Sequence, residues 1–309
     1  MSSVTGQQLD GTGGRANSAA LPPSGRQGGR TARRWVRWFG LLPFVAFLTV
    51  FLLFPAFGVI RKAFVGADGG FSTEAMRKAL STDKKAFRQS VMLSLVTAVL
   101  GVVLGTPLAY AAATAKRPRW LRTVVSAFSG VAANLGGVVL AFAFISLLGF
   151  QGLGTKVLKV FGADIYAHGF KLNDFKGWVT VYLYFQIPLM ILVMLPAIDG
   201  LKDSWREASS NLGGTTWTYW RRVGIPVLLP SMLGGFMLLF ANSFSAYATV
   251  YALNTGANLV PVKISFYLQG DNSGVSAVPF ALATWMIIIM LVSMGTYFWL
   301  RKRAERWQS

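Results

Sequence analysis

The sequence contains no cysteine, a single histidine (His168) and few charged residues for its length. The lack of cysteine excludes a disulfide framework, an iron–sulfur cluster and a thiolate zinc site. One histidine also excludes an imidazole-rich metal site. Charged residues make up 13% of the 309 residues, whereas a soluble domain carries about a quarter. With 53% hydrophobic residues and 23 phenylalanines, the composition predicts a chain that is solvated largely by lipid.

Long apolar runs without a charged residue predict the fold class. Each run reaches the roughly 20 residues that cross the hydrocarbon core as a helix. We therefore expect an all-α membrane protein with six transmembrane helices, at about 38–60, 90–114, 123–148, 178–198, 227–252 and 277–300. Glycines in the third run (Gly130, Gly136 and Gly137) are expected to let helices approach closely.

The ends of the chain and its loops are more polar. Residues 1–34 are rich in Gly, Ser and Arg and cannot bury enough apolar surface to fold, so we expect a disordered cytoplasmic tail. Residues 35–306 form one transmembrane domain, without a visible repeat or second domain. Between the first two helices, residues 61–88 are basic, and Ser72-Thr73-Glu74 predicts the start of a short interfacial helix.

A net charge of +19 raises the possibility of a nucleic-acid partner. The basic residues stand in short clusters beside the apolar runs, without a basic and aromatic binding module. We therefore expect contact with membrane lipid and no nucleic-acid partner. Basic residues are more numerous on the side that holds both termini, which places both termini in the cytoplasm. The basic loop 61–88 opposes this orientation.

The loop between the fourth and fifth helices, residues 204–222, has an organisation of its own. Its apolar side chains recur at helical spacing and give one apolar edge: Leu201, Trp205, Ala208 and Leu212. Gly213 is suited to end this helix because glycine adopts positive φ without steric cost. Thr215 or Thr216 can cap a second short helix. The pattern predicts a helix-turn-helix, either a docking surface or an ordinary interfacial linker.

The same loop resembles the EAA motif of binding-protein-dependent ABC importer permeases. That motif reads E-A-A, three residues, G, nine residues and then I-x-L-P. Here Glu207, Ala208 and Ser209 are followed by Leu212 and Gly213, and Val223, Ile225 and Pro226 fall at the end of the motif. The departures from the pattern are conservative, and the loop precedes the last two helices, as in the family. The chain thus resembles a type I importer permease with a methionine-importer-like transmembrane domain.

The resemblance implies a bacterial inner-membrane permease subunit whose cytoplasmic coupling helix, between the fourth and fifth spans, docks on a separate ATPase. Its implied partners are an ATPase dimer, a second permease subunit (identical or different) and an extracytoplasmic solute-binding protein. ATP and Mg²⁺ would be bound by the ATPase, with no cofactor in this chain and no enzymatic activity of its own. Gly152–Lys156 does not satisfy the P-loop pattern G-x-x-x-x-G-K-[ST].

Uncharged polar residues are the candidates for the solute path, because no acidic or basic residue falls inside the expected spans. We select Asn134, Asn242, Ser245 and Tyr247. Residues 240–249 and 258–261 resemble the polyamine and aminophosphonate branch of the permeases. That resemblance implies a polyamine or a related small polar compound as the solute. A sugar, glycerophosphodiester or iron importer, a six-helix secondary transporter and a non-transporting scaffold are the alternatives.

Overall fold

A computed structural model describes residues 41–66, 69–115, 120–270 and 277–305. Apart from one isolated bridge between Val65 and Phe71, these residues contain helices, turns and bends and no strand. The expected disordered tail, residues 1–34, lies outside the described residues. The all-α prediction is confirmed.

Six helical stretches are long and apolar enough to cross a membrane: Leu41–Ala63, Lys84–Thr114, Gly137–Val160, Phe175–Asp199, Thr216–Ser245 and Val278–Trp299. This is the expected number, and the second, fourth and sixth fall where the charge-free runs predict them. The chain divides into two compact units, Met1–Pro55 and Ala56–Ser309. Residues 41–55 of the first unit are helical and include the π-helical turn η2 (Thr49–Leu53) and the start of α2 (Phe54–Ala63).

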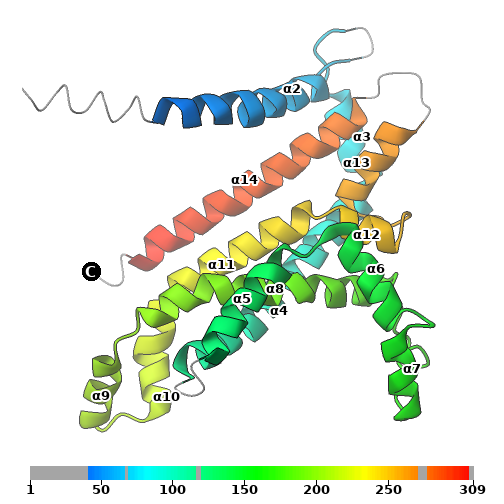
Figure 1. Cartoon of the computed structure of the whole chain (residues 1–309). Coiled ribbons are helices and arrows are strands. Elements are labelled where there is room, and N and C mark those ends of the chain that lie inside the picture. The colour runs from blue at the N-terminus through cyan, green and yellow to red at the C-terminus, as the bar shows by residue number, and fades with distance from the viewer. Residues whose placement is uncertain (1–40, 67–68, 116–119, 271–276, 306–309) are drawn as a thin grey trace, which may run out of the picture. The chain divides into compact units, whose positions relative to one another are not determined.

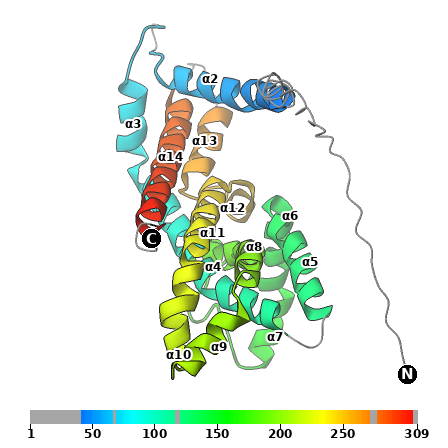
Figure 2. The same ribbon diagram turned by 90° about the vertical axis from the view of Figure 1, so that its left-hand side faces the viewer.

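The second unit is built on four helices that pack side by side (Figures 1 and 2). They are α4 (Lys84–Thr114), α5 (Trp120–Asn134), α8 (Phe175–Asp199) and α11 (Ile225–Ser245). Helix α8 lies in the middle and contacts α4, α5 and α11. Its composition suits this place, because it is apolar all round, as a helix surrounded by other helices is expected to be.

Small residues set the spacing within this bundle. A Cβ atom at Gly105 of α4 would lie 2.6 Å from the Cβ of Met190 on α8, and one at Gly235 of α11 would lie 2.6 Å from the sulfur of Met190. At Gly101, a Cβ would lie 2.9 Å from a Leu239 methyl group. Glycines therefore permit three helices to close around Met190, which is fully buried.

Two of the expected spans are interrupted, although their apolar composition predicts continuous helices. The third, predicted as one helix over 123–148, breaks after Asn134 and resumes as α6 (Gly137–Leu148) and α7 (Leu153–Val160). Gly137 has φ +71°, and no atom would contact a Cβ at Gly130 or Gly136. The expected close helix approach is therefore not seen at Gly130 or Gly136, whereas Gly137 begins α6 and lies against Ala248 of α12.

The fifth span, Thr216–Ser245, is displaced toward the N-terminus relative to the predicted 227–252. It starts earlier, with α10 (Thr216–Tyr219) and the π-helical turn η3 (Trp220–Gly224), and α11 ends at Ser245. A separate helix, α12 (Ala248–Leu253), follows. The two breaks are joined, because the backbone N–H of Gly137 donates to Thr249 Oγ1 at 2.9 Å. Helix α6 also packs on α12.

The bundle has two ends that carry different structures. Helices α9 (Asp203–Asn211) and α10 lie at one end, which we call the hairpin end (Figure 1). At the opposite end, α3 (Glu74–Thr82), α13 (Val260–Gln269) and the start of α14 (Val278–Glu305) pack together. Their shared core includes Ala63, Met76, Phe87 and Leu282. The expected short helix after Ser72 is α3.

Candidate functional site

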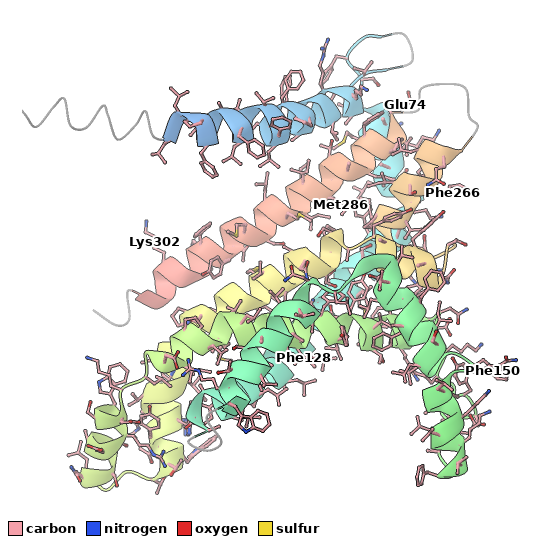
Figure 3. The ribbon with its side chains drawn as sticks, viewed as in Figure 1. Glu74, Phe128, Phe150, Phe266, Met286 and Lys302 are labelled. Atoms are coloured by element: carbon pink, nitrogen blue, oxygen red, sulfur yellow. The ribbon has the colours of Figure 1, made fainter. Side chains whose placement is uncertain are left out.

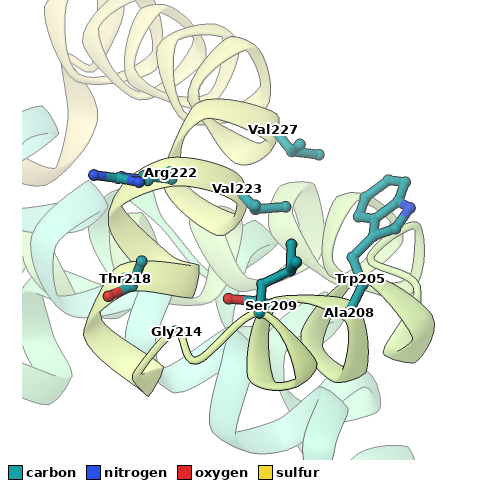
Figure 4. A pocket seen from close by; sticks show the side chains of 9 residues that line it. Trp205, Ala208, Ser209, Gly214, Thr218, Arg222, Val223 and Val227 are labelled. Atoms are coloured by element: carbon teal, nitrogen blue, oxygen red, sulfur yellow. The ribbon is translucent and has the colours of Figure 1, made fainter.

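The loop singled out in the sequence folds as a helical hairpin, α9–α10, whose first helix has no buried residue. Trp205, Ala208, Ser209 and Leu212 share one face of it and line a groove together with Thr218, Val223 and Val227 of the following segment (Figure 4). The groove is mostly apolar and has a volume of about 490 Å³. Since i, i+3, i+4 and i+7 share a helix face, the predicted apolar edge accounts for this lining.

The turn of the hairpin depends on glycine. Gly213 has φ +75°, a conformation that other residues rarely adopt. Its N–H donates to Ser210 O at 2.9 Å, and the N–H of Gly214 donates to Ser209 O at 2.8 Å, which satisfies the last carbonyls of α9. Thr215 then caps α10, its hydroxyl accepting from Thr218 N at 3.3 Å. Both predicted caps are confirmed, with Thr215 as the second.

The hairpin exposes large apolar side chains beside a charged one. Leu212 is 89% exposed and Trp217 is 69% exposed. Glu207 is also exposed, and it takes part in neither of the two ion pairs formed among the described residues. At the end of the predicted motif, Val223 lines the groove, Ile225 is 44% exposed and Pro226 lies in the first turn of α11. An apolar side chain held in solvent at a rigid turn is suited to a contact outside the chain.

The hairpin is attached firmly to the bundle at its base. The Trp220 ring meets Tyr110 of α4 edge to face, with 4.8 Å between ring centroids. Gly224 is buried against that indole, where a Cβ would lie 2.5 Å from a ring carbon. Arg122 of α5 pairs with Asp199 at the end of α8. These contacts join the segments on both sides of the hairpin to α4 and α5.

A cavity of about 460 Å³, mostly apolar but with three polar residues in its lining, lies where the two broken helices end. Three of the four residues chosen for the solute path line it: Asn134 from the end of α5, and Asn242 and Ser245 from the end of α11. Leu189, Leu192, Leu238 and Met290 supply apolar walls. No acidic or basic side chain is among the lining residues.

The hydrogen bonds around this cavity fix which polar atoms remain available. Asn134 Nδ2 donates to Gly130 O at 2.8 Å, and Ser245 Oγ donates to Asn242 O at 3.2 Å. A carbonyl can only accept, so one N–H of Asn134 and the O–H of Ser245 donate within their own helices. Asn134 keeps its second amide N–H and its Oδ1, the Ser245 oxygen can still accept, and the Asn242 amide adds donors and an acceptor. The cavity wall therefore offers both donors and acceptors to a polar molecule.

Tyr247, the fourth chosen residue, is not among the residues that line this cavity. Its hydroxyl lies 2.8 Å from Ser265 Oγ of α13, and its ring stacks on Tyr251 with 5.0 Å between centroids. It joins the segment after the α11 break to α13. Its distance from the cavity follows from the break at Ala246, which redirects the chain.

A buried polar cluster between the helices was not among the residues selected from the sequence. Gln186 of α8 is fully buried; its Nε2 donates to Leu239 O at 2.9 Å and reaches Thr97 Oγ1 at 3.5 Å. Thr97 Oγ1 and Ser243 Oγ lie 2.9 Å apart. The cluster links α4, α8 and α11. The available signal was the presence of a glutamine in an apolar run, which is costly to bury without a partner.

Within the described ranges, no group of three or more His, Asp or Glu side chains is placed to hold a metal ion. The polar groups at both sites are uncharged amides and hydroxyls or exposed surface residues.

Comparison with known proteins finds transport permeases among the relatives of this chain. The molybdenum transport system permease protein ModB of Haemophilus influenzae is 23% identical over 70% of this chain and 94% of its own length. The thiamine transport system permease protein ThiP of the same organism is also 23% identical, over 69% of this chain and 38% of its own length.

Among solved structures, a bacterial ABC transporter that imports the acidic polysaccharide alginate superimposes with a TM-score of 0.68 at 16% identity, over 88% of this chain and 96% of that chain. Residues 101–306 match the family described as binding-protein-dependent transport system inner membrane component. The chain therefore belongs to that family: it is a multi-pass membrane protein and a permease subunit of a type I ABC importer, not an enzyme itself.

Proposed function

We propose that the α9–α10 hairpin is the surface through which this permease is coupled to a separate ATPase, with α9 as the coupling helix. The observation that carries the proposal is the exposed apolar edge of a helix that buries nothing within its own chain. The EAA-like motif falls on this hairpin, with Glu207 on α9 and Gly213 at its turn. The hairpin then faces the cytoplasm, and both termini lie there too.

The hairpin acts as a rigid lever in this proposal. Leu212 and the groove give an apolar contact to the ATPase, and Glu207 gives a charged one at the edge. Closure of the ATPase pair moves α9, and the Trp220–Tyr110 contact carries the motion to α4 and α11. Coupling requires that the ATPase contacts differ between the two states of the permease.

The test is co-purification of the full-length chain with the ATPase encoded beside its gene. We expect Glu207→Ala with Gly213→Pro to abolish it, because proline cannot adopt φ +75°. Gly162→Pro is the matched control, since Gly162 also makes a turn, with φ +83°, at the opposite end. Normal assembly and transport by the double variant would refute the coupling role.

We further propose that a second permease subunit and an extracytoplasmic solute-binding protein are partners of this chain. We also propose that Asn134, Asn242 and Ser245 line the translocation path. The support is their convergence on one uncharged cavity at the helix breaks. Measuring solute uptake into vesicles with and without ATP distinguishes an ABC importer from a secondary transporter. Uptake that follows an ion gradient and ignores ATP would favour the latter.

For the solute, we propose a small polar organic compound that donates hydrogen bonds, such as a polyamine. The acceptor atoms of Asn134 and Ser245 can accept from its N–H groups, and the residues that line the cavity include no basic side chain to pair with an oxyanion. Among the relatives, the name of ThiP refers to thiamine and that of ModB to molybdenum, so they do not select one class. Competition by spermidine, thiamine, molybdate and sulfate for binding to the cognate receptor tests it. Displacement by an oxyanion alone would contradict the proposal.

A further inference from the structure

The segment 61–88, at the end of the bundle opposite the hairpin, carries a dense set of exposed basic side chains. Arg61 and Lys62 end the first membrane span, and Arg77 and Lys78 lie on α3. Lys84, Lys85 and Arg88 occupy the first five residues of α4, which is the next span. All seven are exposed, and the two ion pairs of the described residues involve none of them. Basic charge is normally concentrated on the cytoplasmic side, so this surface needs another explanation.

The acidic residues nearby do not neutralise it. Asp83 is 5% exposed and accepts a hydrogen bond from Tyr267 of α13 at 3.0 Å. Glu74, at the start of α3, is the exposed acid of the described segment (Figure 3). Lys84 and Lys85 also sit at a helix N-terminus, where positive charge is unfavourable. Because these two lysines are electrostatically unfavourable at this end of the helix, we expect an anion from outside the chain to compensate their charge.

The level of the basic side chains relative to the bilayer identifies a lipid headgroup as the partner. Five of the seven stand at the ends of the two spans, so they lie at the level of the lipid headgroups once those spans are inserted. Exposed apolar side chains accompany them: Phe71 is 82% exposed and stacks on Phe64, and Leu80 is 43% exposed. Apolar and basic side chains side by side on a short helix are typical of an interfacial segment on an anionic bilayer. A soluble acidic protein would approach above this level.

The platform behind the charges is rigid. Met76 and Ala79 of α3 pack into the core shared with α13 and α14, and the Trp285 indole donates to Met76 O at 3.1 Å. The Lys62 ammonium lies 5.0 Å from the centre of the Phe280 ring. The helix that carries Arg77 and Lys78 is therefore packed against the core, with their side chains on its exposed face. We propose that the surface formed by α3 and the adjoining ends of α2 and α4 binds the phosphate headgroups of anionic phospholipid in the leaflet opposite the hairpin.

The experiment is native mass spectrometry of the purified full-length chain, titrated with phosphatidylglycerol and with phosphatidylcholine of the same acyl chains. We expect the wild type to retain phosphatidylglycerol preferentially. Since each basic residue at an anionic surface contributes about fivefold to binding, Lys78→Gln/Lys84→Gln/Lys85→Gln should reduce retention by on the order of tenfold or more. Phosphatidylcholine binding should not change.

The matched control is Lys156→Gln/Lys171→Gln/Lys176→Gln. It removes three exposed lysines from the same end of the bundle, where Asp164 and Asp174 dilute the charge. Lys176, like Lys84, lies in the first turn of a span. An equal loss in both triple variants, or equal retention of the two lipids by the wild type, would overturn the proposal. The latter result is also the one expected if the surface serves an acidic protein. The Lys→Arg triple at 78, 84 and 85 should retain the lipid.

Discussion

The α4–α8–α11 core and the α9–α10 hairpin are adjacent in the chain and opposite in construction. In the core, glycines bring helices together around a buried methionine, and polar side chains find partners on neighbouring helices. In the hairpin, α9 buries nothing, and Leu212 stands almost entirely in solvent. The core sequence is explained by contacts within the chain, whereas the hairpin sequence is not. A substitution should therefore affect stability in the first region and function in the second.

The largest effect is expected for Gly105→Val. The new side chain would overlap Met190, since a Cβ at position 105 would lie 2.6 Å from the Met190 Cβ, and Ile187 O limits movement at 3.2 Å. Overpacking of this kind costs about 3 kcal/mol of unfolding free energy. Thermal unfolding of the detergent-solubilised chain measures it. Gly130→Val is the control, because nothing lies within 4 Å of a Cβ there. Equal melting of the two variants would show that the core is less tightly packed than described.

A smaller effect is expected for Thr249→Val, at the junction of the two helix breaks. The substitution keeps the shape and removes the acceptor of the Gly137 N–H. An unsatisfied N–H in this place costs about 1 kcal/mol. Thr284→Val is the control: that threonine is equally buried but bonds to Phe280 O of its own helix. If both variants lose the same stability, the bond between α6 and α12 does not contribute specifically.

The sequence located the spans because the hydrocarbon core excludes charge, and a charge-free run such as 178–198 shows this directly. It failed at the breaks because apolar composition continues through them. Gly136-Gly137 offered a signal, since paired glycines favour turns, but glycine also serves close packing in membranes. Only the position of a neighbour such as Met190 decides between these roles, and a single sequence does not contain it. Helix α13 was missed for a similar reason, although Pro261 stands at its start, where proline is favoured.

The candidate site also has parts that the sequence predicts and parts that it does not. The caps of the hairpin, Gly213 and Thr215, were predictable because they rest on local backbone geometry. The convergence of Asn134 with Asn242 and Ser245 was not, because it depends on where two broken helices end. Tyr247 differs from them only by lying past the break. Periodicity carries no information on such long-range placement.

The smallest effect on stability, and the sharpest test of the comparison, is expected for Leu212→Ser. The leucine is 89% exposed, so its removal takes almost no buried surface from the folded chain, and the unfolding temperature should stay within the error of the measurement. ATP-dependent uptake should nevertheless fall if this side chain docks on the ATPase, because the partner then loses an apolar contact at the turn. Val160→Ser is the control, as Val160 is 84% exposed on α7, at the other end of the bundle. A drop in unfolding temperature would mean that the hairpin stabilises its own chain. Unchanged uptake at normal stability would mean that Leu212 does not carry the coupling.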